Sequence, residues 1–408
     1  MSVLMGKQIV LGITGCIAAY KAAELVRLIV KHGGQVHVIM TRSAREFVSP
    51  LTFQTLSGNP VATDLFALYE ERKIGHISLA QRADVLVVAP ATANSIGKTA
   101  GGIADDLLST AIMATRAPLL FAPAMNEAMW ENPVVQKNMQ ALKSLGYYVV
   151  DPGWGDLACG AQGKGRLADV EDILDEIITI LSPKDFARQE VLVTAGPTHE
   201  PMDSVRFITN PSSGKMGFAL ARALKQRGAS VTLVTGPSAL FSPRNVHVVK
   251  VKTAQEMASA VDKYFSKADI IIKSAAVSDY RPTVISAHKI KKQDAAQQIE
   301  FERTSDILAA LGKKKGNKIL VGFAAETHEI LANAREKLQK KNLDMIVAND
   351  VGKKDSGFGS DVNKVTLLLP GGEVVALPSM SKDDVAQKIL DRIVLLRKER
   401  AAIPDEPA

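Results

Sequence analysis

A glycine-rich turn before a predicted helix is the stretch best suited to chemistry. Residues 211–217 read PSSGKMG and precede a helical pattern over 218–227, while an apolar run from Val191 stops at Gly196 like a buried strand. Amides at a helix start lack helical partners, the helix dipole adds partial positive charge, and Lys215 adds a full charge. The turn is a candidate phosphate site, although its spacing matches neither a Walker A loop nor G-x-G-x-x-G. Similar turns also join strands to helices where no ligand binds.

Two other clusters in the second half would lie near this turn. Residues 274–282 (SAAVSDYRP) are followed by 289–292 (KIKK), and residues 322–327 (GFAAET) are followed by Lys337 and Lys341. The last two are four residues apart, so they share a helix face. Each cluster alone also fits a charged, solvated surface.

Three side chains of the first half could serve acid–base chemistry or substrate binding. His76 can act as a base near neutral pH, although a surface histidine is the simpler interpretation of this residue alone. Asn126 can both donate and accept hydrogen bonds. Cys159 lies in a glycine-rich loop, where a thiol is more exposed and reactive than in a core.

The pattern of strands and helices predicts how these residues are positioned. Apolar strands and amphipathic helices alternate, and the pattern restarts after residues 182–189: 267–276 (KADIIIKSAA) parallels 82–91 (RADVLVVAPA). Alternation of this kind indicates parallel sheets with right-handed crossovers. The sequence therefore predicts an α/β fold of two tandem, doubly wound, Rossmann-like domains. Ligands in such sheets bind beyond the carboxyl ends of the strands.

Composition narrows the class of protein. The chain has 408 residues, of which 46% are hydrophobic, enough for two cores. Its net charge of +7 is spread over short runs, which favours small anionic ligands over nucleic acid. Two cysteines and no signal peptide indicate a cytoplasmic location. No apolar run approaches the roughly 20 residues of a membrane helix.

The first half carries five marks in one order: G-x-T-G-x-I-A-A-Y-K, G-H-I-x-L, P-A-T-A-N, P-A-M-N-x-x-M-W and A-C-G-x-x-G-x-G-R. It resembles the flavin-dependent phosphopantothenoylcysteine decarboxylases. The resemblance implies a flavodoxin-like domain over 1–189 that binds FMN. The implied cofactor-binding residues are Thr14, Gly15, Cys16, Ala91, Thr92, Ser109 and Thr110.

The same resemblance assigns roles to the three reactive side chains. His76 would be the base or substrate-orienting group, Asn126 would hold the substrate carboxylate, and Cys159 would be a proton donor on a flap. The implied reaction oxidises the thiol-bearing carbon, loses carbon dioxide to leave an ene-thiol, protonates it from Cys159 and returns the hydride from reduced flavin.

The second half carries T-A-G-P-T-x-E-x-x-D-x-V-R, N-P-S-S-G-K-M-G, A-A-V-S-D-Y-R-P, K-I-K-K, G-F-A-A-E-T and K-N-L-D-x-I-V-A-N-D. It resembles the CTP-dependent bacterial phosphopantothenate–cysteine ligases, here over residues 190–400, with 401–408 expected to be a disordered tail. Together the two halves resemble the bifunctional coenzyme A biosynthesis proteins. In the implied reaction, 4′-phosphopantothenate and CTP give an acyl-cytidylate and pyrophosphate, and the cysteine amine then displaces CMP. A divalent cation such as Mg²⁺ would neutralise the triphosphate.

The ligase resemblance implies catalytic roles for Lys289 at the phosphates and for Asn210, with Arg206 near it, at the acyl intermediate. Two positions depart from the resembled pattern: Lys273 stands where a small or apolar residue is expected, and Ser305 stands where a proline is expected. The implied nucleotide-binding residues are Ser212, Ser213, Gly214, Lys215, Gly217, Lys273, Ser274, Ala275, Asp279, Lys289, Ser305, Asp306, Ile307, Leu308, Phe323, Lys337 and Lys341.

Several alternatives stay open. The first half could decarboxylate peptide C-terminal cysteines beside an unrelated second domain, or it could be a non-catalytic regulator that inhibits a phosphatase. A pair of nicotinamide dehydrogenase domains would need a G-x-G-x-x-G turn, which neither half has. The resemblance also implies a homo-oligomer, with decarboxylase trimers joined by ligase dimers into a dodecamer.

Overall fold

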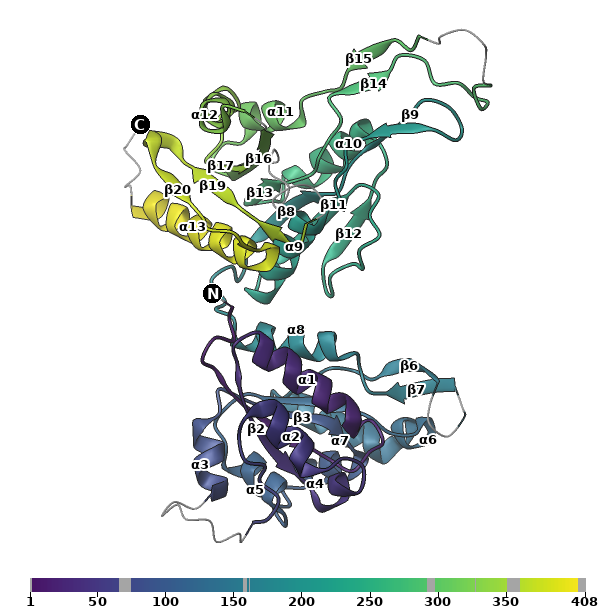
Figure 1. Ribbon diagram of the computed structural model, residues 1–408, viewed down its shortest axis with the longest axis vertical. Helices are drawn as coiled ribbons and strands as arrows, with labels where there is room; N and C mark the ends of the chain where they lie inside the picture. The colour runs from purple at the N-terminus through teal and green to yellow at the C-terminus, as the bar shows by residue number, and fades with distance from the viewer. Residues whose placement is uncertain are drawn as a thin grey trace. The chain divides into compact units, whose positions relative to one another are not determined.

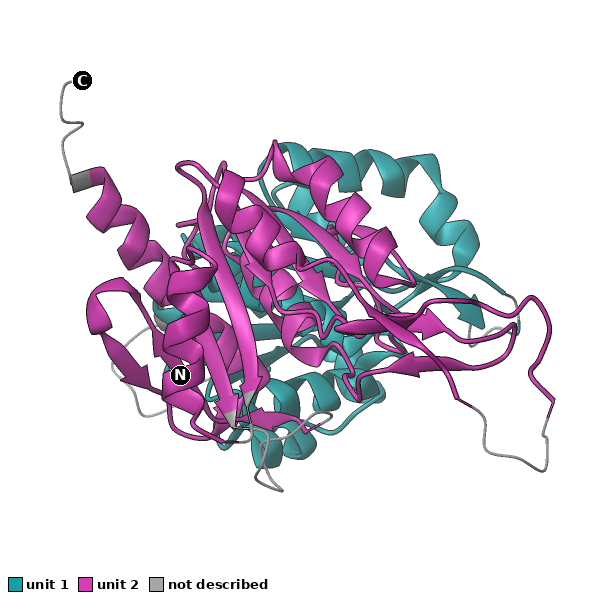
Figure 2. Ribbon diagram, turned by 90° about the horizontal axis from the view of Figure 1, so that it is seen from above, with its two compact units in different colours: residues 1–182 teal, residues 183–408 magenta. Residues whose placement is uncertain are grey.

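The chain forms two compact units, residues 1–182 and 183–408, which Figure 2 colours separately. This computed structural model describes residues 2–65, 75–156, 160, 162–291, 298–326, 328–350 and 360–402. Both units are built from mostly parallel sheets with helices on their faces, which confirms the predicted fold class. No helix among these residues has the length and apolar character needed to cross a membrane.

Unit 1 contains a five-stranded parallel sheet in the order β2-β1-β3-β4-β5 (Figure 1). Its strands are β1 (Gln8–Ile13), β2 (Gln35–Met40), β3 (Val85–Ala91), β4 (Leu119–Pro123) and β5 (Tyr148–Val149), and β6 (Gly153–Asp156) and β7 (Gln162–Arg166) form a separate hairpin. Its helices are α1 (Ala19–Lys31), η1 (Arg42–Glu46), α2 (Pro50–Ser57), α3 (Gly75–Arg82), α4 (Ala93–Ala100), α5 (Leu107–Ala114), α6 (Glu127–Glu131), α7 (Pro133–Ser144) and α8 (Val170–Leu181).

The strands of unit 1 bury both faces. Alternate residues of β1 contribute to two different cores: Ile9 and Leu11 pack with α1 and α8, whereas Val10 packs with α4, α5 and α7. This explains why the strands read as continuous apolar runs rather than as alternating patterns. The strand order reverses between β1 and β3, which is where sheets of this order bind their ligands.

Unit 2 contains an eight-stranded sheet in the order β12-β11-β8-β13-β16-β17-β19-β20. The first six strands are parallel, and β19 and β20 add antiparallel. The sheet strands are β8 (Glu190–Ala195), β11 (Ser230–Thr235), β12 (His247–Lys250), β13 (Ile270–Lys273), β16 (Ile319–Glu326), β17 (Met345–Asp350), β19 (Val365–Leu368) and β20 (Val374–Ala376). The parallel strands follow the Rossmann order, with its reversal between β8 and β13.

Helices cover both faces of this sheet as well. Helices α9 (Lys215–Gln226) and α13 (Lys382–Ala402) pack on one face, and α10 (Ala254–Phe265), α11 (Ile307–Lys314) and α12 (Ile330–Lys340) pack on the other. A short turn, η2 (Pro370–Gly372), joins β19 to β20. Because α13 continues through Ala402, residues 401 and 402 of the predicted tail are helical, and the rest of the tail lies outside the described residues.

Short strands outside the sheet build two further features of unit 2. One is an arm made of β9 (His199–Pro201) with β10 (Phe207–Thr209) and β14 (Tyr280–Pro282) with β15 (Phe301–Arg303). Figure 1 shows β14 and β15 extending away from the sheet. The other feature is the pair β18 (Val362–Asn363) and β21 (Met380–Ser381), which leads into α13.

Candidate active sites

In unit 1, Thr14 joins the carboxyl ends of β1 and β3. Its buried hydroxyl donates to the Pro90 carbonyl at 2.7 Å and accepts from the Thr92 N–H at 3.1 Å. Because the hydroxyl proton is already used, a phosphate at this turn would rely on backbone amides. Helix α1 suits that role, since it begins with no side-chain cap and no acidic residue in its first turn.

The other predicted cofactor residues of this turn are packed closely. Gly15 lies directly against Ser43, and Ala91 is buried. Burial raises the pKa of the Cys16 thiol, only partly offset by a hydrogen bond from the Ala18 backbone. Cys16 therefore stays a neutral thiol at neutral pH, consistent with a packing role.

Thr92, Ser109 and Thr110 act within the starts of two helices. The Thr92 hydroxyl caps α4, the Ser109 hydroxyl accepts from the Asp106 N–H at 3.1 Å in a capping box, and Thr110 donates to the Ala104 carbonyl at 3.4 Å. These bonds hold the helix starts at the edge of the sheet. They leave backbone groups, rather than these hydroxyl protons, as the donors for a cofactor.

The hairpin β6–β7 is anchored on both sides of Asn126. The Met125 N–H donates to the Gly165 carbonyl at 3.0 Å, and the Lys164 N–H donates to a Glu127 carboxylate oxygen at 3.2 Å. At Gly165, with φ of +149°, any Cβ would overlap the Met125 carbonyl. The base of the hairpin is thereby fixed beside Asn126.

Asn126 itself is exposed and caps α6, where its Oδ1 accepts from the Ala128 N–H at 2.9 Å. Cys159 belongs to the connection between β6 and β7, outside the described residues. His76 lies in the first turn of α3, but its side chain is also outside the described part of the chain. The structure thus places Asn126 beside β7, while the positions of Cys159 and of the His76 side chain stay predictions.

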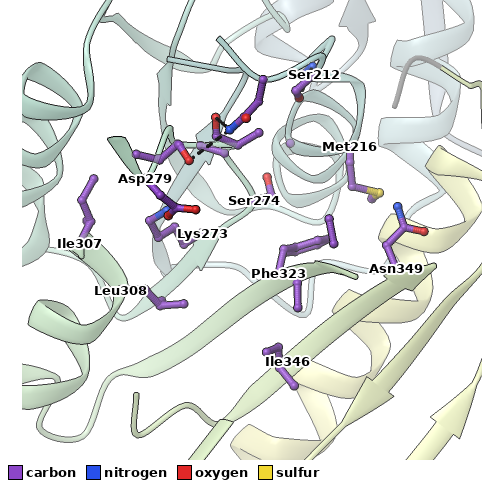
Figure 3. Close-up of a pocket in the computed structure, with 18 of the residues that line it drawn as sticks. Ser212, Met216, Lys273, Ser274, Asp279, Ile307, Leu308, Phe323, Ile346 and Asn349 are labelled. Atoms are coloured by element: carbon purple, nitrogen blue, oxygen red, sulfur yellow. Dashed lines mark hydrogen bonds between the residues drawn. The ribbon is translucent and has the colours of Figure 1, made fainter. Parts of the chain in front are cut away.

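In unit 2, a cavity of about 470 Å³ lies where the strand order reverses (Figure 3). Its lining comes from the turn after β10, the ends of β13, β16 and β17, and helices α11 and α12. It includes Asn210 and every predicted nucleotide-binding residue except Lys289: Ser212, Ser213, Gly214, Lys215, Gly217, Lys273, Ser274, Ala275, Asp279, Ser305, Asp306, Ile307, Leu308, Phe323, Lys337 and Lys341. One cavity therefore collects predicted residues that lie as far as 131 positions apart in the chain, from Asn210 to Lys341.

The start of α9 forms the part of this cavity that is suited to bind a phosphate. Helix α9 has no side-chain cap and no acidic residue in its first turn. Gly214 has φ of +82° and lies within 3.2 Å, measured from a Cβ placed on it, of the Gly196 backbone, so only glycine suits this position. The Ser238 hydroxyl donates to the Ser213 carbonyl at 3.0 Å and steadies the loop. The backbone amides of this helix start suit an anion, and Lys215, which pairs with Asp361 at 2.6 Å, adds positive charge beside them.

A charged cluster lines the side near α11 and α12. Lys341 pairs with Asp306 at 2.9 Å, and both lie near Lys273 and Asp279. Burial, with the nearby Lys341 charge, lowers the pKa of Lys273 from 10.5 to about 8, although Asp306 and Asp279 oppose the shift. Lys273, which departs from the resembled pattern, is therefore a largely buried amine inside the cavity.

Asn210 lies at the cavity, but Arg206 and Lys289 do not line it. The Asn210 Nδ2 donates to the Ala276 and Val277 carbonyls, each at 3.2 Å. Arg206 donates to the Ile290 carbonyl at 3.0 Å, which holds the exposed Lys289 segment on the arm. The roles of Arg206 and Lys289 therefore stay predictions, because neither residue is among those that line this cavity.

Four polar residues of the cavity, Thr304, Asn349, Asn363 and Lys382, have no predicted role. Asn349 belongs to the K-N-L-D-x-I-V-A-N-D mark, so the sequence could have indicated it as a site residue. Asn363 and Lys382 belong to no such mark. They reach the cavity because β18 and the start of α13 lie beside the end of β17.

Comparison with known proteins identifies the family. A model described as Flavoprotein matches residues 2–182, and a model of the DNA/pantothenate metabolism flavoprotein C-terminal domain matches residues 186–396. The coenzyme A biosynthesis bifunctional protein CoaBC of Bacillus subtilis (strain 168) is 48% identical over 405 residues, covering 97% of this chain and 98% of that protein. The chain belongs to this family of bifunctional coenzyme A biosynthesis proteins.

A further relative and a solved structure are also similar to this chain. The protein of the same description from Escherichia coli (strain K12) is 44% identical over 402 residues, covering 97% of this chain and 99% of that protein. A crystal structure of the C-terminal domain of such a protein is 42% identical and covers 53% of this chain and 99% of its own, with a TM-score of 0.46. The prediction of a bifunctional coenzyme A biosynthesis enzyme, with a decarboxylase and a ligase domain, is confirmed.

The buried amine of Lys273 predicts a pH-dependent stability. Because its pKa falls from 10.5 to about 8 on folding, the unfolded chain binds more protons between these values, and stability should rise with pH there. The free-energy cost of burying the charged Lys273 amine is fully present below pH 8 and is lost by about pH 10.5. Lys273→Met removes this cost, so it should stabilise unit 2 more at pH 7 than at pH 10. We expect the change in the free energy of unfolding to be larger at pH 7 by on the order of 2 kcal/mol.

Scanning calorimetry of the full chain at both pH values measures this difference, with the exposed Lys313→Met as the matched control. A Lys273→Met effect that is the same at pH 7 and pH 10 would contradict the assignment of a buried, charge-destabilised amine.

Proposed function

We propose that unit 2 joins 4′-phosphopantothenate to L-cysteine with CTP, and that unit 1 decarboxylates the product to 4′-phosphopantetheine with FMN. The cavity of unit 2 is the observation that carries the proposal. It lies at the strand-order reversal and combines an uncapped helix start, a lysine cluster and an apolar side. Family membership supports the same pair of activities.

The cavity offers distinct places for the parts of CTP. The start of α9 with Lys215 suits the phosphates, because amides and an ammonium converge there. Ile307, Leu308 and Phe323 supply apolar surface, and Asp279 supplies acceptors, for the cytidine. Lys337 and Lys341 add positive charge on the same side.

The two ligase steps balance without a further reagent. A carboxylate oxygen of 4′-phosphopantothenate bonds to the α-phosphorus of CTP as the bond to pyrophosphate breaks. The cysteine nitrogen then bonds to the acyl carbon, the bond to CMP breaks, and the amine releases a proton. Preorganised donors at the phosphates would stabilise the charge that develops in both steps.

Two further contributors to the ligase reaction, Lys289 and Mg²⁺, are not supplied by the residues that line the cavity. Lys289 lies on the arm, so its contact with the phosphates requires movement of the arm or assembly with a second copy. No three His, Cys, Asp or Glu side chains of the described residues gather as a metal cage. Mg²⁺ would then enter mainly on the CTP phosphates, as is usual for this ion.

The residues of unit 1 suit FMN. Helix α1 follows the turn at Thr14 and Gly15 and begins without a side-chain cap, so its first backbone amides can hold the phosphate of FMN. When bound, FMN supplies the oxidation and reduction that a simple cysteine derivative lacks for losing carbon dioxide. Asn126 would hold the substrate carboxylate, His76 would orient the substrate, and the Cys159 thiol would give a proton to the ene-thiol carbon.

The remaining parts of the proposal concern assembly and location. We infer a cytoplasmic homo-oligomer in which decarboxylase trimers and ligase dimers form a dodecamer, as the family resemblance implies. Its partners would be the small-molecule substrates, with no nucleic acid.

A single assay tests both activities. The purified full chain receives 4′-phosphopantothenate, L-cysteine, CTP and Mg²⁺, and mass spectrometry follows the products. We expect 4′-phosphopantetheine, carbon dioxide and CMP. Accumulated phosphopantothenoylcysteine would refute the decarboxylase half alone, and absence of CMP would refute the ligase half.

Cys159→Ser should separate the early and late steps of unit 1. Without the thiol proton, the reaction should stop at the oxidised ene-thiol, which is two hydrogens lighter than 4′-phosphopantetheine. Mass spectrometry of a single turnover distinguishes the two compounds, and unchanged ligase activity of the variant serves as its folding control. Normal formation of 4′-phosphopantetheine would remove Cys159 from this role.

Lys289→Gln should strongly slow pyrophosphate release from CTP, because the charge on the transferring phosphate would lose its ammonium partner. Removing one such donor costs about 10²- to 10³-fold in rate. Decarboxylation of supplied phosphopantothenoylcysteine should continue at the wild-type rate, which makes unit 1 an internal control. An unchanged rate of pyrophosphate release would show that Lys289 takes no part.

A further inference from the structure

The turn between β9 and β10 contains a carboxylate that is buried although its surroundings are open. Asp203 is 4% exposed, whereas residues 204–207, which follow it, are all exposed. A buried charge is stable only where hydrogen bonds replace the water that it has lost. The partners of Asp203 therefore show what this carboxylate holds in place.

One carboxylate oxygen of Asp203 closes the turn itself. Its Oδ1 accepts from the Val205 and Arg206 N–H groups, each at 2.7 Å. The Met202 N–H donates to the Arg206 carbonyl at 2.9 Å and completes the turn. These bonds fix the backbone at Arg206, which is one of the residues predicted to be catalytic.

The second carboxylate oxygen reaches another segment of the arm. Asp203 Oδ2 accepts from the Ile290 N–H at 3.1 Å. The Arg206 Nη1 donates to the Ile290 carbonyl at 3.0 Å and to Asp203 Oδ2 at 3.5 Å. The turn thus holds both backbone groups of Ile290. Because Lys289 directly precedes Ile290, these bonds also set the direction in which the Lys289 side chain leaves the chain.

The negative charge of Asp203 strengthens this arrangement. Burial raises the pKa of the carboxyl, but hydrogen bonds from the Arg206, Val205 and Ile290 backbones outweigh burial and lower the pKa overall. The carboxylate is therefore ionised at neutral pH. Hydrogen bonds to an ionised acceptor are roughly twice as strong as those between neutral groups. A neutral side chain of the same shape would hold the two segments less firmly.

We infer that Asp203 is a positioning residue of unit 2, which holds Lys289 and Arg206 as one unit by fixing the backbone of Ile290. This inference rests on the proposed function, in which Lys289 acts at the phosphates of CTP. Asp203 is not among the residues that line the cavity, so it acts through these two residues. Whatever brings Lys289 to the phosphates brings Arg206 with it.

Asp203→Asn tests this inference with little change in shape. The amide keeps one oxygen for the turn, but it presents a donor to the Ile290 N–H, so Lys289 should lose its fixed position. Misplacement of a catalytic group by about 1 Å can cost about 100-fold in rate. The assay measures pyrophosphate release from CTP and 4′-phosphopantothenate, with hydroxylamine trapping the acyl group. We expect this rate to fall about 10- to 100-fold.

Glu302→Gln is the matched control. Glu302 lies on the same arm, pairs with Arg281 at 2.8 Å and is 47% exposed at its side chain. The substitution also replaces a carboxylate by an amide, but at a pair that does not include Ile290. The rate of pyrophosphate release should stay at the wild-type value.

A double-mutant cycle separates positioning from a general effect on the fold. In the Lys289→Gln background the group that Asp203 positions is missing. Asp203→Asn should therefore lower the remaining rate by less than about 2-fold. A purely structural role would lower the rate by the same factor in both backgrounds. Scanning calorimetry of each variant reports whether unit 2 is folded.

Ile290→Pro tests the same hydrogen bond from its other side. Proline removes the N–H that Asp203 accepts and leaves the carboxylate in place. The loss in rate should match that of Asp203→Asn, and the combined variant should lose no more than either variant alone. If Asp203→Asn does not fold, the cycle with Lys289→Gln is run with Ile290→Pro.

The outcomes separate this inference from the proposed function. Equal losses with and without Lys289 would overturn the inference, and so would a wild-type rate in Asp203→Asn. A wild-type rate in Lys289→Gln would overturn it as well, because Asp203 would then have no catalytic group to position at the phosphates. A wild-type chain that releases no pyrophosphate would refute the ligase proposal itself.

Discussion

Parallel strand pairing is the constraint on which both candidate sites depend. It carries the loops that follow successive strands to one edge of each sheet, and the reversals at β1/β3 and β8/β13 send the following helices to opposite faces. The residues that follow the strands are therefore gathered at that edge. In unit 1 it gathers Thr14, Thr92 and Ala124, and in unit 2 it gathers the α9 turn and the end of β13.

Backbone amides, rather than hydroxyls, supply most of the polarity at these edges. Helices α1 and α9 begin without side-chain caps, whereas the hydroxyls of Thr14 and Ser109 donate or accept within the protein. A helix start without a side-chain cap keeps its partial positive charge available to a ligand. Side chains that look like ligand contacts in a sequence can therefore be the supports that hold those amides in place.

The sequence predicts the fold and most of the cavity because periodicity and small-residue turns act locally. It cannot predict contacts made by long-range pairing. The glycine-rich stretch around Cys159 is predicted to be a loop, but it includes the strands β6 and β7, whose glycines hide the strand pattern. Asn363 and Lys382 carry no local pattern, because only the pairs β17–β19 and β18–β21 bring them to the cavity. Lys289 is the opposite case, since its motif is clear in the sequence but the residue lies on the arm and is not among those that line the cavity.

The two ends of the unit 2 cavity have different structural origins. The nucleotide side is made by parallel strands and the helices that follow them, as in any doubly wound nucleotide site. The other side is made by the end of β17, by Asn363 of β18 and by Lys382 at the start of α13. Strand β18 pairs with β21, which leads directly into α13, so this side depends on a strand pair outside the parallel sheet. The parallel strand order therefore places only part of the cavity, and long-range pairing near the end of the chain completes its lining.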